Sequence, residues 1–155
     1  APVKCQRAGA QQQPASRERR LQAAMVSLAI PLPRSRIMIK VFGHKAPDTD
    51  ATASAIIWAW YMEQKGETAV PYVLGEPNTE AAFVVNYWGF DSPEILKDIE
   101  HEQDVIIVDT NNPAELPENI NNANIIEIID HHLLVGNLKT KNPISVTMRR
   151  GGAAS

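Results

Sequence analysis

Cysteine, long apolar runs and an excess of basic residues are all scarce or missing in this sequence. The single cysteine, Cys5, excludes a disulfide scaffold and a four-cysteine zinc site. No run reaches the roughly 18 apolar residues that a membrane-spanning helix needs. The net charge of −3 argues against a strongly basic nucleic-acid-binding protein. The 155 residues, 44% of them hydrophobic, fit one globular domain of the α/β type.

The charged residues are divided unevenly along the chain. Residues 1–36 contain seven lysines and arginines against one acid, whereas residues 37–155 contain eight against 17 acids. We expect residues 1–36 to be a disordered or non-native basic extension, with the true start at Met25 or Met38. Arginine-rich, acid-poor sequence can also mark an organellar transit peptide, which we rank second. For the acidic domain we expect a cytoplasmic location.

Short apolar runs alternate with helical patterns, which predicts an α/β fold with a parallel sheet flanked by helices. Thr79 is a suitable cap for one helix, and Gly66 follows another at the position of a C-cap glycine. Ser92 and Pro93 supply a cap and a first-turn proline for a third. The expected strands are 37–42, 69–74, 104–108 and 125–129, the expected helices are 51–65, 79–88 and 92–100, and 117–121 is expected to form one helical turn.

Polar clusters follow three of the four predicted strands. Because the carboxyl ends of parallel strands meet at one edge of a sheet, the side chains of these clusters should converge. Imidazoles and carboxylates form a nitrogen and oxygen ligand set, which suits Mn, Zn, Co or Fe. The fourth histidine, His101, lies in a charged stretch and is expected to be solvated. The three clusters contain His44, Asp48 and Asp50, then Asp109, then Asp130, His131 and His132.

The spacing within the clusters is compatible with two neighbouring metal ions. Asp48 and Asp50 are two residues apart, so a loop can direct them to different ions, and Asp109 on the central strand could bridge both. Two divalent ions roughly 3.5–4 Å apart recur in phosphoryl chemistry. So many carboxylates would repel an anionic substrate unless metal were present. The clusters therefore predict a metal site. They predict a phosphate-bearing substrate only if bound metal ions attract it.

Each cluster also has a purely structural interpretation. Asp48 or Asp50 could cap the helix that follows. Asp109 could simply end its strand, because the residues after it favour a loop. The adjacent pair His131 and His132 is rarely needed for packing at a strand end, so a functional role is favoured there.

Taken in order, the three clusters resemble the DHH phosphoesterase superfamily. The Pro47-Asp48-Thr49-Asp50 form is most similar to the family II, manganese-dependent inorganic pyrophosphatases. The resemblance extends over about residues 37–149, and each motif alone is weakly specific, whereas the ordered set is strongly so. The motifs are Gly43-His44-Lys45-Ala46-Pro47-Asp48-Thr49-Asp50, Val108-Asp109-Thr110-Asn111 and Ile129-Asp130-His131-His132.

The resemblance implies two Mn²⁺ ions, for which Co²⁺ or Mg²⁺ could substitute. His44 and Asp48 would bind one ion, and Asp50 and His131 would bind the other. Asp109 would bridge the pair, with a nucleophilic hydroxide held between the ions. The implied reaction is the hydrolysis of pyrophosphate to two phosphates.

The resemblance also implies roles around the ions. His132 would face the substrate and bind or protonate a phosphate, so His132 and Asp109 are the implied catalytic residues. Asp130 would orient a histidine through a hydrogen bond. Thr110 departs from the family pattern, since many members have histidine there.

A further bridging aspartate and a second, substrate-clamping domain would follow this region in the family. The sequence after Met148 also departs from the family's Arg-Pro-Val-Gly-like stretch. We therefore expect residues 37–155 to be an incomplete DHH-type domain, truncated at the C-terminus and by itself weakly active or inactive. Homodimers through the sheet edge are also implied.

Two other functions stay open at this point. A DHH-type nuclease or phosphodiesterase would share the metal ligands and act on short oligonucleotides or cyclic dinucleotides. The threonine between Asp48 and Asp50 argues against it, because the nucleases often have glycine there. The chain could also be a non-catalytic metal-binding fragment. The favoured partner is pyrophosphate, with neither nucleic acid nor membrane expected.

Overall fold

Six parallel strands form one sheet in the part of the chain that the structure, a computed structural model, describes: residues 38–154. The interpretations of residues 1–36 lie outside this range. The strands are β1 (Ile39–Phe42), β2 (Ala69–Val73), β3 (Glu94–Ile95), β4 (Asp104–Val108), β5 (Asn124–Asp130) and β6 (Ser145–Met148). The helices are α2 (Thr49–Gln64) and α3 (Thr79–Tyr87), and two short 3₁₀ turns are η1 (Pro113–Glu115) and η2 (Ile120–Asn122).

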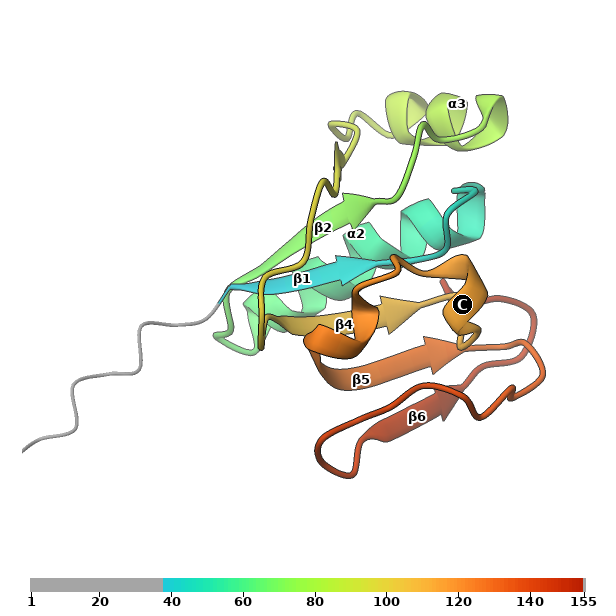
Figure 1. Ribbon diagram of the computed structural model, residues 1–155. Coiled ribbons are helices and arrows are strands. Elements are labelled where there is room, and N and C mark those ends of the chain that lie inside the picture. Colours follow the sequence, from blue (N-terminus) through green and yellow to red (C-terminus); the bar gives the residue numbers. More distant parts are fainter. Residues whose placement is uncertain (1–37, 155) are drawn as a thin grey trace, which may run out of the picture. The chain divides into compact units, whose positions relative to one another are not determined.

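The strand order is β3-β2-β1-β4-β5-β6 (Figure 1). The chain moves outward from β1 to β2 and β3, then returns to place β4 on the other side of β1. This reversal makes the carboxyl ends of β1 and β4 the switch point of the sheet, where ligands bind in open α/β folds. The predicted parallel α/β fold is confirmed.

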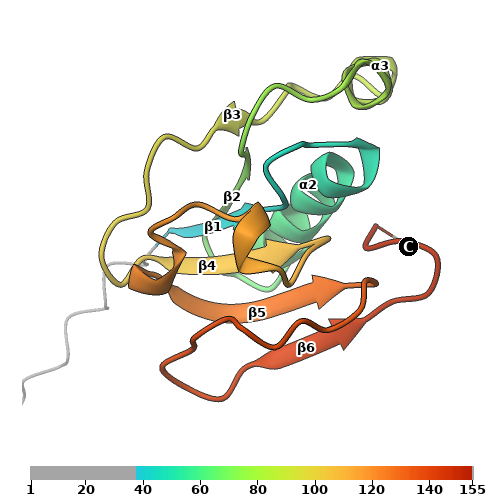
Figure 2. The same ribbon diagram turned by 45° about the vertical axis from the view of Figure 1, so that its right-hand side comes forward.

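The centre of the sheet is buried on both faces, which explains the unbroken apolar run of β4. Ile106 and Val108 pack on the same face as the helix residues Ala55 and Ala59. Val105 and Ile107 point to the opposite face, because side chains alternate along a strand. Figure 2 shows α2 on one side of the sheet and the short turns η1 and η2 on the other.

Helix α2 begins and ends at residues with suitable backbone chemistry. The Asp48 carboxylate accepts a hydrogen bond from the N–H of Ala51 at 2.9 Å, which satisfies one donor of the first turn. Gly66 follows the helix with a φ of 86°, as a glycine in the left-handed region does. The start of α3 differs from the expectation: Asn78, not Thr79, caps it, accepting from the N–H of Ala81.

The predicted helix at 92–100 is wrong. Glu94 and Ile95 instead form the edge strand β3, paired with Tyr72 and Val73. The N–H of Leu96 continues the pairing by donating to the carbonyl of Val73. Pairing with the sheet edge overrides the local capping pattern, since tertiary contacts routinely outweigh helix propensity.

Two further details were not predicted correctly. The helical turn expected at 117–121 lies slightly later, at η2. Strand β6 was not expected, although Ser145–Met148 alternates polar and apolar residues. Within residues 38–154, no helix combines the length and apolar character needed to cross a membrane.

Candidate metal centre

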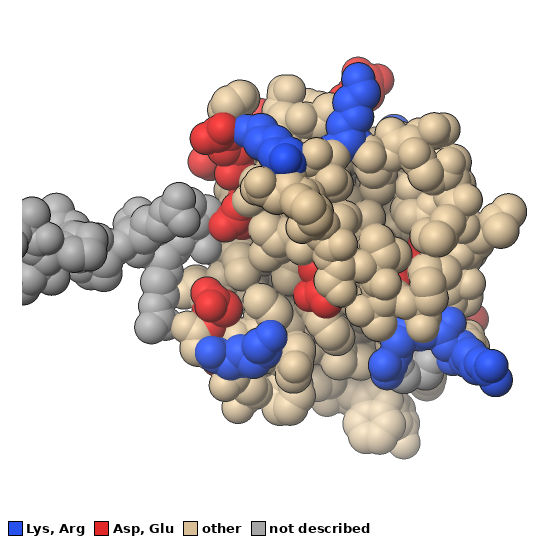
Figure 3. Space-filling model, turned by 90° about the horizontal axis from the view of Figure 1, so that it is seen from below, with Lys and Arg blue, Asp and Glu red and all other residues tan. Residues whose placement is uncertain are grey.

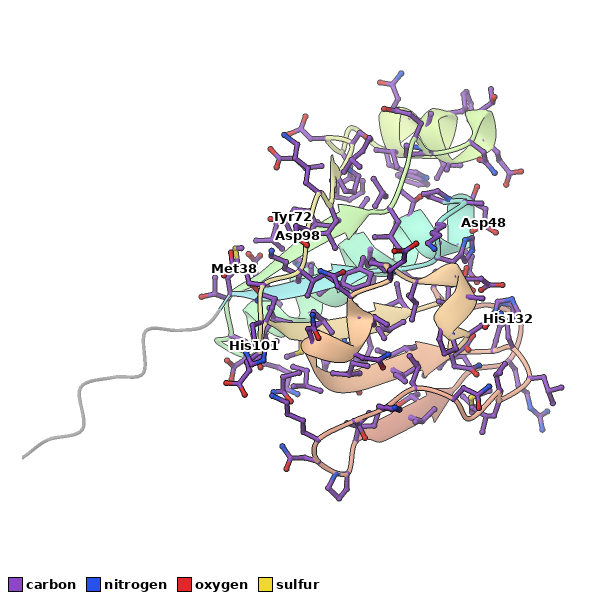
Figure 4. The ribbon with its side chains drawn as sticks, in the orientation of Figure 1. Met38, Asp48, Tyr72, Asp98, His101 and His132 are labelled. Atoms are coloured by element: carbon purple, nitrogen blue, oxygen red, sulfur yellow. The ribbon has the colours of Figure 1, made fainter. Side chains whose placement is uncertain are left out.

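Three loops converge at the carboxyl ends of the central strands. They follow β1, β4 and β5, which are neighbours in the sheet. Figure 4 shows Asp48 and His132 at this edge, whereas His101 lies at the opposite end. His101 is exposed in a turn, as expected from its charged surroundings. The convergence predicted from the topology is therefore present.

The first loop is held tightly against the sheet and α2. Gly43 follows β1, and a Cβ placed there would lie 2.7 Å from the Cβ of Ala51, so only glycine fits without a shift. The same loop carries Asp48, whose carboxylate caps α2. His44 is thereby directed inward, with its side chain 16% exposed.

Asp109 lies at the centre of the cluster. Its φ is 59°, a left-handed conformation that is uncommon for residues other than glycine. Its N–H donates to the carbonyl of Ile129 at 2.8 Å, which fixes this turn against β5. The carboxylate is 2% exposed and has a histidine on each side: Nε2 of His44 is 3.3 Å from Oδ2, and Nε2 of His131 is 3.0 Å from Oδ1.

A second carboxylate lies beside each of these histidines. Oδ1 of Asp48 is 3.7 Å from Nε2 of His44. Oδ2 of Asp50 is 3.4 Å from Nε2 of His131. The five predicted metal ligands thus form two groups that share one carboxylate. These groups are His44, Asp48 and Asp109, and Asp50, His131 and Asp109.

The donors fit divalent cations. Oδ1 of Asp109 is buried and accepts no hydrogen bond, despite the nearby imidazole of His131. Burial raises the pKa of Asp109, and the negative charges of Asp50 and Asp48 add to this against the opposing effect of His44. A cation would compensate this crowded negative charge. The ligand atoms of His44, Asp48 and Asp109 all lie within 4.8 Å of one another, and so do those of Asp109, His131 and His132.

The Asp130 carboxylate holds His131 and His132 in place through hydrogen bonds. Its buried Oδ1 accepts the N–H groups of His131 and His132, and lies 2.7 Å from Nδ1 of His132. Burial alone would raise the pKa of Asp130, but these bonds and one from Asn111 lower it overall. The Asp130 contact raises the pKa of His132. Its predicted contact with a histidine is therefore present.

Asn111 is a site residue that the sequence analysis did not single out. Its side-chain amide donates to Oδ2 of Asp130 and to the carbonyl of Leu133. Its side-chain oxygen accepts the N–H of Val135 at 2.7 Å. The loop after β5 is thus tied to the loop after β4. The sequence signal for this was that Asn111 ends the quoted motif Val108-Asp109-Thr110-Asn111, where it was given no role of its own.

Thr110, the departure from the family pattern, makes a local contact. Its hydroxyl donates to Oε2 of Glu115 at 2.6 Å. The Glu115 carboxylate contributes to the raised pKa values of His44 and His132, behind the larger effects of Asp109 and Asp130. Glu115 therefore adds negative charge beside both imidazoles, a role that the sequence analysis did not predict.

The segment after β6 also reaches the site. The N–H groups of Ala153 and Ala154 donate to the two carboxylate oxygens of Asp50, at 2.8 and 2.9 Å. Burial raises the pKa of Asp50, but these two bonds, together with the contacts of Asp109 and His131, lower it overall. Figures 1 and 2 show this segment turning back across the sheet edge. The sequence analysis noted only that this segment departs from the family's pattern and assigned it no role in the site.

The chain is similar in sequence to the members of one protein family. The model of the DHH family, N-terminal domain, matches residues 38–155. A Streptococcus mutans protein named as a probable manganese-dependent inorganic pyrophosphatase is 37% identical over 119 residues, which are 76% of this chain and 38% of that protein. A Staphylococcus epidermidis protein of the same name is 43% identical over 105 residues, 67% of this chain and 34% of that protein.

One solved structure is similar in both fold and sequence. It is a Methanococcus jannaschii protein assigned to the family II inorganic pyrophosphatases, with a TM-score of 0.66 and 32% identity. The match covers 75% of this chain and 36% of that one. The chain therefore spans less than two fifths of the length of these relatives.

Proposed function

The chain belongs to the DHH family, and from this premise we propose that it carries the two-manganese centre of an inorganic pyrophosphatase. The observation that supports this most strongly is the shared carboxylate of Asp109, which lies between His44 and His131. A bridging carboxylate flanked by two ligand groups suits a pair of ions. The names of the relatives described above support the choice of manganese as the metal and pyrophosphate as the substrate.

The proposed ligands are His44 and Asp48 for one ion, Asp50 and His131 for the other, and Asp109 for both. Manganese accepts this nitrogen and oxygen set, and Co²⁺ or Mg²⁺ could substitute. Bound ions would supply Lewis-acid chemistry, which activates water and neutralises phosphate charge. The remaining contributions come from side chains of the protein.

His132 is proposed to act on the substrate directly. Its Nδ1 is held by Asp130, so the ring would address a phosphate through Nε2. The side chain is 53% exposed and lines the cavity in front of the site. Because contact with Asp130 raises its pKa, His132 retains a proton to a higher pH than a free imidazole. It can then donate that proton to a leaving phosphate.

The domain organisation is also part of the proposal. Residues 37–155 would form the metal-binding part of a DHH-type domain, preceded by the extension 1–36. We propose that full activity needs a second, substrate-clamping part that completes the site. An open site leaves substrate charge exposed to water, which weakens electrostatic stabilisation of the transition state. We also propose a cytoplasmic, membrane-independent protein that forms homodimers through an edge of the sheet.

The nuclease or phosphodiesterase alternative is less well supported. On the face seen in Figure 3, basic side chains lie apart, among acidic and uncharged ones, rather than in a stripe. Nucleic-acid-binding surfaces usually gather lysine and arginine along one face. Thr49, between Asp48 and Asp50, donates its hydroxyl to Glu80 and so ties the loop to α3. We therefore favour pyrophosphate over an oligonucleotide.

The test measures phosphate release from pyrophosphate by a protein that contains this chain at the full length of the relatives. We expect hydrolysis with Mn²⁺, loss of hydrolysis on chelation, and little cleavage of a short RNA. RNA cleavage without pyrophosphate hydrolysis would support the phosphodiesterase alternative. Manganese binding without hydrolysis of either substrate would support a non-catalytic metal-binding protein.

A further inference from the structure

A cavity of about 710 Å³ opens in front of the proposed metal centre, and one basic residue lines it. Among the described residues that line this cavity, Arg150 is the only lysine or arginine. Its sequence neighbour Arg149 does not line the cavity. The lining residues are Asp48, Asp50, Asp109, His131, His132, Arg150, Gly151, Gly152 and Ala154.

The backbone around Arg150 is anchored on both sides of the site. On one side, β6 pairs with β5, and the N–H of Arg149 donates to the carbonyl of Asp130 at 2.8 Å. On the other side, the N–H groups of Ala153 and Ala154 hold the carboxylate of Asp50. Arg150 therefore belongs to a short bridge between two residues of the metal centre, and this fixes its approach to the cavity.

Gly151 and Gly152 allow the bridge to pass close to Asp50. Gly151 has a φ of 91°, which a residue with a side chain rarely adopts. A Cβ on Gly152 would lie 2.9 Å from Oδ2 of Asp50. The two glycines thus turn the chain over the carboxylate directly after Arg150, so its position follows from the same contacts that orient Asp50.

The negative charge of the carboxylates that line the cavity suggests why an arginine there is useful. Three carboxylates line it, and two divalent ions would leave only a small positive excess for a phosphorylated anion. A guanidinium adds a fixed positive charge and a planar set of donors that matches phosphate oxygens in a bidentate way.

We propose that Arg150 binds a phosphoryl group of the substrate and forms an anion subsite next to the metal ions. The inference rests on the proposed function in two respects: metal ions occupy the centre, and the substrate carries a phosphate. The ligand class is a phosphate-bearing anion, whether pyrophosphate or a phosphodiester. Arg150 is thus a substrate-binding residue on the segment after β6. It supplies a fixed positive charge, whereas His132 is proposed to supply a proton.

The test uses the full 155-residue chain loaded with Mn²⁺ and inorganic phosphate as the probe. Phosphate binding is followed by ³¹P relaxation and by calorimetry. Because hydrogen bonds to charged groups contribute about 1.5–3 kcal/mol, Arg150→Gln should weaken phosphate binding about 10–100-fold. Arg150→Lys should recover part of the loss, since lysine keeps the charge without the bidentate geometry. Mn²⁺ affinity should stay unchanged in both variants.

Arg149→Gln is the matched control, because it removes the same charge one residue away from the cavity. The inference is overturned if Arg149→Gln weakens phosphate binding as much as Arg150→Gln, or if Arg150→Gln has no effect. Failure of the wild-type chain to bind phosphate also overturns it. Hydrolysis of an oligonucleotide instead of pyrophosphate would contradict the proposed function but leave the subsite intact, so the two failures are distinguishable.

Discussion

Oδ1 of Asp109 and Nε2 of His131 lie 3.0 Å apart, yet this buried carboxylate oxygen accepts no hydrogen bond. A buried polar atom without a partner is costly, and native proteins rarely keep one without a reason. Here the two atoms are both metal-ligand types and point into the same centre. Both atoms therefore have the chemistry and the position that the proposed shared metal site requires.

Replacing Asp109 by asparagine should separate metal binding from folding. Asp109→Asn removes the shared ligand, so Mn²⁺ affinity should fall by more than about 100-fold, beyond what loss of a supporting residue costs. The metal-free protein should keep or gain stability, because a buried charge is removed and asparagine tolerates the left-handed backbone at this position.

Calorimetric Mn²⁺ titration and thermal unfolding with and without Mn²⁺ check this prediction. For the wild type, Mn²⁺ at about 100 times its Kd should add about 2.7 kcal/mol of stability. The variant should show no such gain at the same concentration. Unchanged Mn²⁺ affinity in Asp109→Asn would show that Asp109 does not bridge the ions.

Two substitutions at Asp48 should separate its capping role from its proposed metal role. Asn and Asp cap helices about equally well, so Asp48→Asn should leave metal-free stability nearly unchanged, whereas Asp48→Ala should cost about 0.5–2 kcal/mol. Both variants should bind Mn²⁺ more weakly. Urea unfolding and Mn²⁺ calorimetry report the two roles, and normal Mn²⁺ binding by Asp48→Asn would leave Asp48 as a cap alone.

Gly152→Ala should disturb one of the two ions more than the other. The added Cβ would clash with the Asp50 carboxylate and push the segment after β6 away from it. Because supporting contacts of metal ligands are typically worth 10–100-fold in affinity, binding at the Asp50 and His131 group should weaken by about that factor. The His44 and Asp48 group should be spared.

Titration with Mn²⁺ should then show one tight and one weakened step. Ala154→Gly is the control, since it keeps the N–H that Asp50 accepts and adds no bulk. Equal weakening of both steps would mean that the segment supports the whole centre rather than Asp50.

Glu127→Gln should stabilise the protein in a pH-dependent way. Burial raises the pKa of Glu127, against smaller opposing effects of Trp58 and Lys65. A carboxyl group with a raised folded-state pKa contributes stability below its unfolded pKa and loses it as pH rises through the folded value. Glutamine mimics the protonated form, so the variant should unfold at a higher temperature near pH 7 but match the wild type near pH 4.

Thermal unfolding of the metal-free protein across this pH range is the measurement. Glu63→Gln, on the exposed side of α2, serves as the control. A stability difference between Glu127→Gln and wild type that does not change with pH would contradict the assignment to this carboxyl group.

Much of the fold was predictable because local chemistry and tertiary structure agree. The run Val105 to Val108 is apolar on both faces and became a central strand. The helix at 92–100 was predicted wrongly because its start resembles a helix cap, whereas pairing with β2 decided its conformation. Strand β6 escaped notice because its four residues gain stability from β5, which a sequence pattern does not show.

The site residues also fall into those that could be predicted from the sequence and those that could not. Each proposed metal ligand was recognisable from its residue type and its place after an apolar strand. Asn111 was not, because its importance lies in tying two loops together through a single side chain. Ala153 and Ala154 were not, because they hold Asp50 through backbone N–H groups that every residue except proline possesses.

The sequence by itself determined the parallel α/β architecture and the set of imidazoles and carboxylates at the strand ends, because hydrophobic patterning and residue type are local properties. Only the tertiary structure decided that Asp109 lies between His44 and His131, and that the segment after β6 returns to Asp50. Those relationships join residues that are far apart along the chain. They arise from the packing of parallel strands, which brings their carboxyl ends to a common edge.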